Sequence, residues 1–500
     1  MDVFNALLLT VYIAPACVLM LFALNLYAML FFFLRRKRQA RHDTDNLLQR
    51  FRDRFADADL PHIVTQIPLY NEYNVAERVM RAAARMSYPA GRHTIQVLDD
   101  STDGTCELVD RVADDLRASG TDVQVVRRPS REGFKAGALE YGLNRTTAEY
   151  FAIFDADFVP PEDFLRRTIA VMLLKSNVGI VQARWGHLNR GRSLVTRAQG
   201  VGIDGHFAVE QTARAWNNFF MNFNGTAGLW RRQAIVDAGG WEHDTLTEDM
   251  DLSYRSQLAG WQPYFLLDLV VPAEIPEDIN AFKSQQFRWA KGSIQTAIKL
   301  LPRVFRSKLP LVMKVQAFFH MTHYIIHPIM LWLAIMALPL LLLTTVSISG
   351  AVFAVIFALF ILSTLAPTFL YAVSQCCLYK RGWKRLALLP FLTSLGVGIA
   401  ISNTRAVAEA IGGHESPFIR TPKRGDSEQK VYSVRMPFLM MLELFVGAYC
   451  FASLGYYLNA ERYFIGPFLL LYAVGFTAVG VLSLIHHVGQ FRWARATRNA

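Results

Sequence analysis

Phe151-Ala152-Ile153-Phe154-Asp155-Ala156-Asp157 is the segment from which the fold class follows. An apolar run of this kind is typical of a buried strand, and the two acidic residues indicate where the strand ends. Comparable strand segments cover residues 62–70, 94–100, 122–128 and 178–185. Segments with helical patterns lie between them, at residues 75–86, 105–117, 135–144 and 161–175.

This alternation of strands and helices predicts a doubly wound α/β domain around a parallel sheet. Such sheets bind ligands at the carboxyl ends of their strands. Three polar motifs occur at these ends, namely Tyr70-Asn71-Glu72, Asp99-Asp100 and Asp155-Ala156-Asp157. Strand assignment and motif position therefore agree, and together they predict a ligand site at one edge of the sheet.

The composition excludes an ordinary soluble enzyme. Hydrophobic residues make up 52% of the 500 residues, and the mean hydropathy is +0.21. The net charge is +11, with basic residues gathered beside apolar segments at 35–38, 380–385 and 420–435. Such clusters follow the positive-inside rule, so they indicate membrane lipid as a partner and argue against nucleic acid. The five cysteines have no disulfide or metal-ligand spacing.

The apolar N-terminus predicts a transmembrane helix within residues 1–34, followed by a basic cytoplasmic linker at 35–60. The α/β domain occupies residues 61–300, and a membrane domain occupies residues 301–500. Four further stretches are long enough for spans of roughly 20–25 residues. They are residues 316–345, 351–375, 436–458 and 463–488.

Residues 386–411 are apolar or amphipathic and have basic flanks on both sides. Because both flanks are expected on the cytoplasmic side, we predict a helix that lies in the interface or re-enters the membrane; a further crossing is the alternative. The topology predicts a multi-pass protein of the plasma (inner) membrane with a cytoplasmic α/β domain. Glu443, inside a predicted span, is expected to face a cavity and to line an acceptor or glycan path.

One further run, Gln285-Gln286-Phe287-Arg288-Trp289, lies just before the membrane domain. It follows, in order, Asp99-Asp100, Asp155-Ala156-Asp157 and Thr247-Glu248-Asp249. This series resembles the membrane-embedded family 2 glycosyltransferases, which include cellulose, chitin, hyaluronan and mannan synthases. The resemblance covers about residues 61–488 and implies a GT-A-type, Rossmann-like domain that takes a sugar from a nucleotide sugar.

Asp155 and Asp157 are the predicted metal ligands. Mg²⁺ or Mn²⁺ prefers oxygen ligands and commonly bridges carboxylates to substrate phosphates; a plain turn after the strand is the alternative. The resemblance makes Asp249 the general base, since inverting sugar transfer needs a single base for the acceptor hydroxyl. The alternative for this motif is that Thr247 caps the helix that follows it.

The resemblance assigns the nucleotide sugar to a group of residues at the strand ends. They are Pro68, Tyr70, Glu72, Asp99, Asp100, Lys135, Asp155 and Arg288. Arginine suits a diphosphate because it donates two parallel hydrogen bonds. For Lys135 the alternative is a solvated lysine at a helix start.

A second group is assigned to the acceptor, with Trp289 as an apolar wall for its sugar. It comprises Phe223, Gly225, Thr226, Glu248, Gln285 and Trp289. Because Gln285, Arg288 and Trp289 share one helical face, an amphipathic interface helix with a tryptophan at the membrane edge is the alternative.

Phe418-Ile419-Arg420-Thr421-Pro422-Lys423, within a loop at 412–433, resembles the gating loop of cellulose synthases and adds Thr421 and Lys423 to the donor site. Arg420 departs from the usual valine, and the alternative is a plain basic loop. Residues 95–103 and 134–139 are most similar to the mannan-synthase-type branch of the cellulose-synthase-like proteins.

The first hypothesis is a processive, inverting hexosyltransferase that uses UDP-glucose or GDP-mannose to extend and export a β-linked polysaccharide, alone, as an oligomer or with accessory export proteins. The second is a single transfer to a ceramide- or polyprenyl-type lipid, and the third is a membrane scaffold without activity. Since single-transfer enzymes typically lack the gating loop, Lys423 distinguishes the first two.

Overall fold

The computed structural model describes residues 3–343, 350–414 and 437–496. Its sheet has seven strands in the order β3-β2-β1-β4-β6-β5-β7. They are β1 (Ile63–Leu69), β2 (His93–Asp99), β3 (Asp122–Val126), β4 (Tyr150–Ile153), β5 (Val178–His187), β6 (Gly228–Arg231) and β7 (Gln262–Ala273). The five strands predicted from the sequence are confirmed, with small differences at their ends.

The predicted parallel sheet is confirmed for six of the seven described strands, and β6 is the exception. β6 pairs antiparallel with both β4 and β5. Its first residue, Gly228, lies opposite Ile153, the last residue of β4. The chain therefore enters β6 from the ligand edge of the sheet and must run the other way. This direction carries the loop just before β6 past Asp155.

Helices cover both faces of the sheet. α2 (Ala76–Ala84), α3 (Thr105–Ala118) and α5 (Phe164–Leu174) share one apolar core with the sheet. α4 (Phe134–Leu143), α8 (Arg232–Asp237) and α9 (Glu248–Leu258) share the other. The four helices predicted between the strands are confirmed. Two further helices, α6 (Leu194–Gly205) and α7 (Thr212–Trp216), flank a π-helical segment at His206–Gln211.

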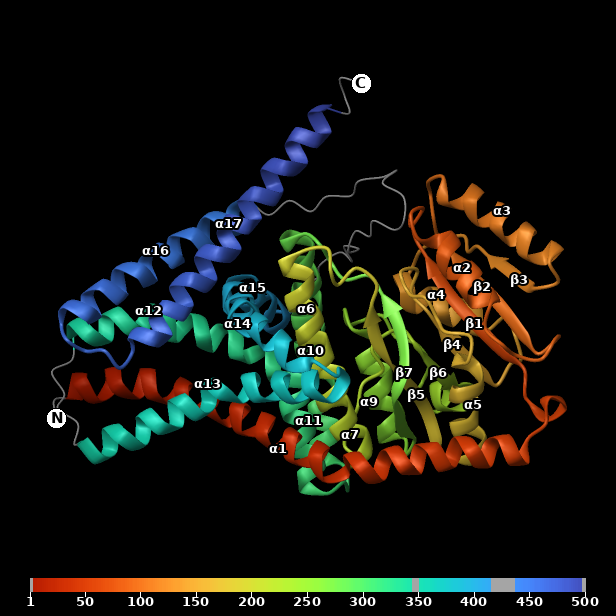
Figure 1. Cartoon of the computed structure of the whole chain (residues 1–500), viewed down its shortest axis with the longest axis horizontal. Helices are drawn as coiled ribbons and strands as arrows, with labels where there is room; N and C mark the ends of the chain where they lie inside the picture. The colour runs from red at the N-terminus through yellow and green to blue at the C-terminus, as the bar shows by residue number, and fades with distance from the viewer. Residues whose placement is uncertain (1–2, 344–349, 415–436, 497–500) are drawn as a thin grey trace.

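Five helical segments of the described chain are long and apolar enough to cross a membrane. They are formed by α1 (Val3–Arg54), α11 (Leu311–Thr322) with α12 (Ile326–Leu343), α13 (Gly350–Leu378), α16 (Pro437–Asn459) and α17 (Gly466–Ala496). In Figure 1 the first half of α1 and helices α12, α13 and α16 lie to the left and the sheet lies to the right, while the second half of α1 runs beneath the sheet. The chain is therefore a multi-pass membrane protein.

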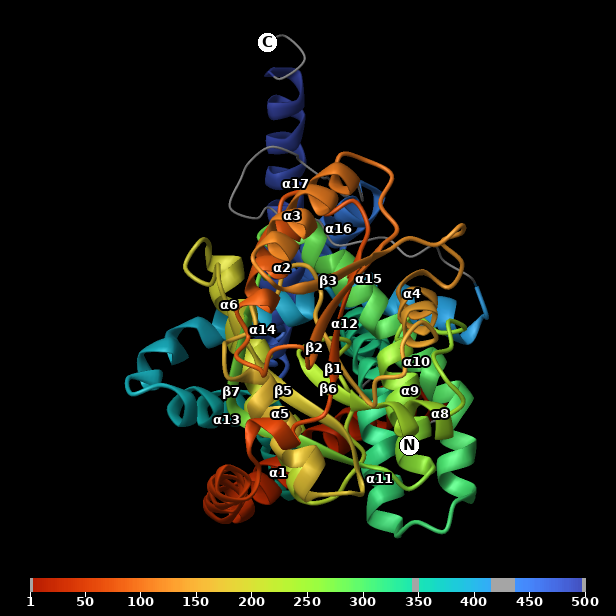
Figure 2. The same cartoon turned by 90° about the vertical axis from the view of Figure 1, so that its right-hand side faces the viewer.

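Two segments of the membrane region differ in detail from simple spans. α14 (Leu389–Gly398) and α15 (Ala400–Ile411) belong to a bent pair with an angle of 41°, which fits a broken span or a re-entrant segment. α1 does not end at residue 34 but continues through the basic segment expected to be a linker. Near its end, Leu47 and Phe51 pack into the core of the sheet domain, which explains why the helix persists. Figure 2 shows α1 and α13 on the same side of the molecule.

Helix α10 (Ile279–Arg306) joins the sheet domain to the membrane helices. Its Lys283 is fully buried and lies 2.7 Å from Glu443 of α16, which is also fully buried. Lys283 Nζ also donates to Ser483 Oγ of α17 at 3.2 Å. Glu443 thus faces a protein interior, and the Lys283 ammonium anchors α10 to two membrane helices.

We expect Lys283→Met to destabilise the protein by about 3–5 kcal/mol, because it leaves the Glu443 carboxylate buried without its counter-charge. The double variant Lys283→Met/Glu443→Leu removes both charges and should recover most of this loss. Thermal unfolding in detergent micelles measures both variants. A double variant as unstable as the single one would show that lost packing, and not the unpaired charge, causes the effect.

Candidate active site

A cleft lies at the ligand edge of the sheet. Its walls come from the ends of β1 and β4, the start of α4, the loop before β6, the start of α9 and one face of α10. Thirteen of the residues predicted for the site line it: Pro68, Tyr70, Glu72, Asp100, Lys135, Asp155, Asp157, Gly225, Glu248, Asp249, Gln285, Arg288 and Trp289. Segments from residue 68 to residue 289 are thus brought to one place.

Lys135 is at the centre of the cleft. Its ammonium forms an ion pair with Asp155 and donates to the carbonyl oxygen of Gly225 at 2.8 Å. Burial alone would lower the pKa of Lys135, but the carboxylates of Asp155 and Glu248 outweigh burial and raise this pKa. The lysine is therefore charged and buried, so the alternative of a solvated lysine at a helix start is wrong.

Asp249 projects from the first turn of α9 toward the loop that contains Gly225. Its Oδ1 accepts from the Met250 N–H at 2.8 Å. A Cβ placed on Gly225 would lie 3.0 Å from Asp249 Oδ2 and 3.3 Å from Lys135 Nζ. Burial and the charge of Glu248 raise the pKa of Asp249 to about 7. A carboxylate with this pKa is suited to accept and release a proton near neutral pH.

The alternative role predicted for Thr247, as a side-chain cap of α9, is wrong. Its hydroxyl makes no capping hydrogen bond and instead lies 3.1 Å from Thr296 Oγ1 on α10. A Cβ on Gly292 of α10 would come within 2.6 Å of Thr247 Cγ2. Close packing of α10 on the start of α9 therefore sets the position of Arg288 relative to Asp249.

Arg288 lies on the same face of α10 as Gln285 and Trp289, and all three line the cleft. Burial lowers the pKa of Arg288, while the carboxylates of Glu248 and Asp155 act in the opposite direction. The motif therefore contributes to the cleft, and α10 is more than an amphipathic helix at the membrane edge. The guanidinium of Arg288 faces the same region of the cleft as the carboxylates of Glu248 and Asp155.

At the opposite end of the cleft, Asp100 accepts two hydrogen bonds from Arg128, at 2.8 and 2.6 Å. The guanidinium of Arg131 lies 3.3 Å from the centroid of the Tyr70 ring. Sequence reasoning missed both arginines, although they stand close together after β3 in Arg127-Arg128-Pro129-Ser130-Arg131. A cluster of arginines directly after a strand end was the sequence signal that could have identified them as residues of the site.

Three of the predicted residues that the structure describes do not line the cleft. Asp99 is buried and pairs with Arg127, while its Oδ1 accepts from the Ser101 N–H at 3.1 Å. Phe223 packs against Trp230 in the core. Thr226 Oγ1 accepts from the Asp155 N–H at 2.9 Å and so supports the cleft from behind. Thr421 and Lys423 lie outside the described residues.

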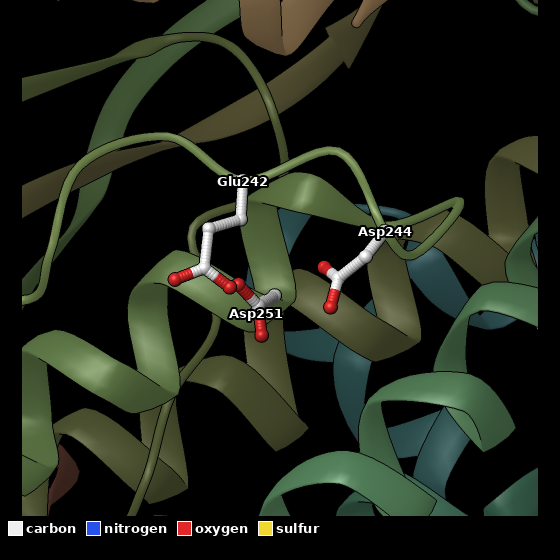
Figure 3. Close-up of side chains that lie close together, drawn as sticks. All are labelled: Glu242, Asp244 and Asp251. Atoms are coloured by element: carbon white, nitrogen blue, oxygen red, sulfur yellow. The ribbon is translucent and has the colours of Figure 1, made fainter.

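Two groups of carboxylates are candidates for a divalent cation. Asp155 and Asp157 line the cleft and offer the oxygen donors that Mg²⁺ or Mn²⁺ prefers, so their chemistry fits the predicted ion. Glu242, Asp244 and Asp251 also converge, as Figure 3 shows. The ammonium of Lys299, however, binds all three, at 2.7 Å from Asp244 and 3.1 Å from Asp251. A lysine already provides the positive charge there.

Known proteins resemble this chain in sequence and in fold. The family described as glycosyltransferase like family 2 matches residues 61–292. Glucomannan 4-beta-mannosyltransferase 2 of Arabidopsis thaliana is 42% identical over 51% of this chain, which spans 49% of the relative's length. Glucomannan 4-beta-mannosyltransferase 7 of the same plant is 33% identical over 85% of this chain and 77% of its own. The chain thus spans about half the length of the first relative and most of the second.

Among solved structures, a mannosyltransferase from Pyrobaculum calidifontis, in complex with GDP-mannose and Mn²⁺, has the same fold. Its TM-score is 0.51 at 18% identity, and the match covers 79% of this chain and 100% of that one. This likeness confirms the GT-A-type fold of the α/β domain.

We expect Gly225→Ala to lower catalytic turnover on the order of 100-fold, because its Cβ would meet Asp249 and displace its carboxylate. The matched control is Gly91→Ala. Gly91 has a φ of +73°, close to the +79° of Gly225, but a Cβ there has no atom within 4 Å. Both variants carry the same backbone strain, of about 1 kcal/mol. Equal activity losses would contradict the role given to the Gly225 contact.

Proposed function

The chain belongs to the family 2 glycosyltransferases, in the mannan-synthase-type branch of the cellulose-synthase-like proteins, and we propose that it transfers mannosyl residues from a nucleotide sugar to a growing β-linked polysaccharide. The observation that carries this proposal is the carboxylate of Asp249, with a pKa of about 7, beside Lys135 and Asp155 in one cleft. The relatives named above support mannose over glucose as the sugar.

The donor lies across the carboxyl ends of the strands. Tyr70, Asp100 and Arg131 line the end of the cleft that we assign to the nucleoside, and Lys135 and Arg288 face the diphosphate. Asp155 and Asp157 would hold the divalent cation. When bound there, Mg²⁺ or Mn²⁺ supplies positive charge that balances the charge of the departing diphosphate.

Asp249 acts as the base in one inverting step. Its carboxylate takes the proton from an acceptor hydroxyl as that oxygen forms a bond to the anomeric carbon of the donor. The bond between this carbon and the diphosphate oxygen breaks at the same time, and the nucleoside diphosphate leaves with its electron pair. The ammonium of Lys135 and the guanidinium of Arg288 stabilise the leaving charge.

The acceptor approaches from the side of α10. Trp289 and Gln285 line this wall, and the same helix is anchored to α16 and α17 through Lys283. A product formed here lies next to the membrane helices, which supports repeated transfer and export through them. Thr421 and Lys423 strengthen the case for repeated transfer by their resemblance to a gating loop.

The membrane is the plasma (inner) membrane, and the sheet domain lies on its cytoplasmic face. The basic residues in the middle of α1 support this orientation, since Arg35 and Arg36 follow the apolar half of that helix directly. A nucleotide sugar made in the cytoplasm then reaches the cleft without crossing the bilayer.

Product analysis tests the proposal. Membranes that contain the protein receive Mn²⁺ or Mg²⁺ with radiolabelled GDP-mannose, UDP-glucose or UDP-N-acetylglucosamine, each alone. We expect label only from GDP-mannose, in a high-mass product sensitive to β-mannanase, and loss of transfer after chelation. Label confined to a solvent-extractable lipid would contradict a polysaccharide product and favour a single transfer, which Lys423→Ala would leave unchanged.

The pH dependence tests the base. Because Asp249 must be ionised, kcat/KM should rise with pH and level off above a pKa of about 7. One unit below this pKa only about a tenth of the groups are ionised. Asp249→Asn should lower kcat at least about 100-fold.

A second variant tests whether Asp249 is the group whose titration sets the pH dependence of kcat/KM. Glu248→Gln removes a negative charge that raises the pKa of Asp249, so the rising limb should move to lower pH. Asp244→Asn is the control, since that carboxylate binds Lys299 outside the cleft. A limb that stays in place in Glu248→Gln would exclude Asp249 as the titrating group.

A further inference from the structure

The end of β5 contributes two side chains to the cleft that neither the sequence motifs nor the mechanism uses. Trp185 and His187 both line the cleft. They are two residues apart in a strand, so their side chains project from the same face of the sheet. The ring of Trp185 packs edge-on against Phe158, with centroids 5.2 Å apart, and lies 5.0 Å from Phe207.

Each of these side chains has a buried nitrogen with no hydrogen-bond partner among the described residues. The atoms are Nε1 of Trp185 and Nδ1 of His187. The side chain of His187 is only 3% exposed. A buried polar atom without a partner costs about 1–3 kcal/mol, so a pair of such atoms in a ligand cleft points to groups that a ligand provides.

Asp204 on α6 fixes the orientation of His187. The carboxylate is fully buried, and His187 Nε2 lies 3.1 Å from its Oδ1. Arg190 binds its other oxygen, which also accepts from Gln375 Nε2 and Tyr379 OH, each at 3.0 Å. Burial favours the neutral acid, but these donors hold the pKa of Asp204 well below its ordinary value.

The ionised carboxylate also defines the tautomer of His187. An ionised carboxylate only accepts, so Nε2 of His187 carries a proton and donates to Asp204; when the ring carries that proton alone, Nδ1 is an acceptor. Trp185 Nε1–H is a donor only. The strand end therefore offers one acceptor and one donor beside the flat face of an indole. A hydroxyl group both donates and accepts, and a pyranose ring packs well on an indole.

We propose that Trp185 and His187 form a subsite that binds the hydroxyl groups of a pyranose ring. The proposal rests on the function proposed above and extends it to residues outside the family motifs. β5 is four strands away from β2 in the sheet order. At about 4.8 Å per strand, the subsite lies about 19 Å from the nucleoside end of the cleft, and so belongs to sugar binding.

The sugar is either the hexose of the donor or a residue of the acceptor glycan, and two variants with separate substrates distinguish these sources. Trp185→Phe keeps an aromatic ring against Phe158 and removes the N–H. His187→Gln keeps a donor for Asp204 and removes the second ring nitrogen. For both, KM and equilibrium binding are measured with GDP-mannose and with mannotetraose, and the affinity for GDP is measured alongside.

We expect each variant to lower the affinity for either GDP-mannose or mannotetraose about 10-fold and to leave the affinity for GDP unchanged. Weaker GDP-mannose binding would assign the donor hexose, and weaker mannotetraose binding would assign the acceptor. Trp230→Phe and His327→Gln are matched controls, because Trp230 Nε1 and His327 Nδ1 are also buried without a partner but do not line the cleft. These controls should change neither affinity.

Two outcomes would overturn the subsite. Unchanged affinities for both sugars in an active protein would reject the subsite alone and leave the proposed function intact. Equal losses in the Trp230→Phe and His327→Gln controls would show that a general loss of stability causes the effect. A wild-type protein that binds GDP but neither sugar would reject the subsite and the proposed function together.

Discussion

The buried ammonium of Lys135 is the interaction on which the cleft depends. Asp155 follows β4, whereas Glu248 and Asp249 are adjacent at the start of α9, and the negative charges of these three residues would repel one another in the cleft. One lysine, bonded to Asp155 and to the Gly225 carbonyl, offsets part of this repulsion and holds the loop before β6 in place. The partial compensation leaves Asp249 with a raised pKa, which is the property that a base needs.

Helix α10 extends the same constraint into the membrane. Gly292 allows α10 to touch Thr247, Lys283 ties it to Glu443, and buried Lys291 lies 2.9 Å from Glu409 of α15. Each contact is short, and two are ion pairs whose disruption leaves a buried charge. A shift of the membrane helices would therefore move Arg288 and Trp289 within the cleft.

The sequence predicted the parts that local patterns encode. Apolar runs that end in acidic residues identified β1, β2 and β4, and long apolar stretches identified the membrane helices. β6 was missed because its four residues, Gly228–Arg231, are too few to show an alternating pattern of apolar and polar side chains. Its direction depends on where the chain returns to the sheet, which no local pattern encodes. The contacts of Asp99 with Arg127 and of Lys299 with three carboxylates are tertiary, so no spacing along the chain reveals them.

Asp204 shows why the membrane helices belong to the site itself. Two of its donors, Gln375 and Tyr379, come from α13 and the residue just beyond it, while His187 comes from the sheet. Without α13 this carboxylate would lose two hydrogen bonds in a buried position, and its hold on His187 would weaken. The orientation of His187 in the cleft therefore depends on a membrane helix that lies about 190 residues later in the chain. A sheet domain cut free of the membrane helices would keep its strands but would lose the arrangement of this end of the cleft.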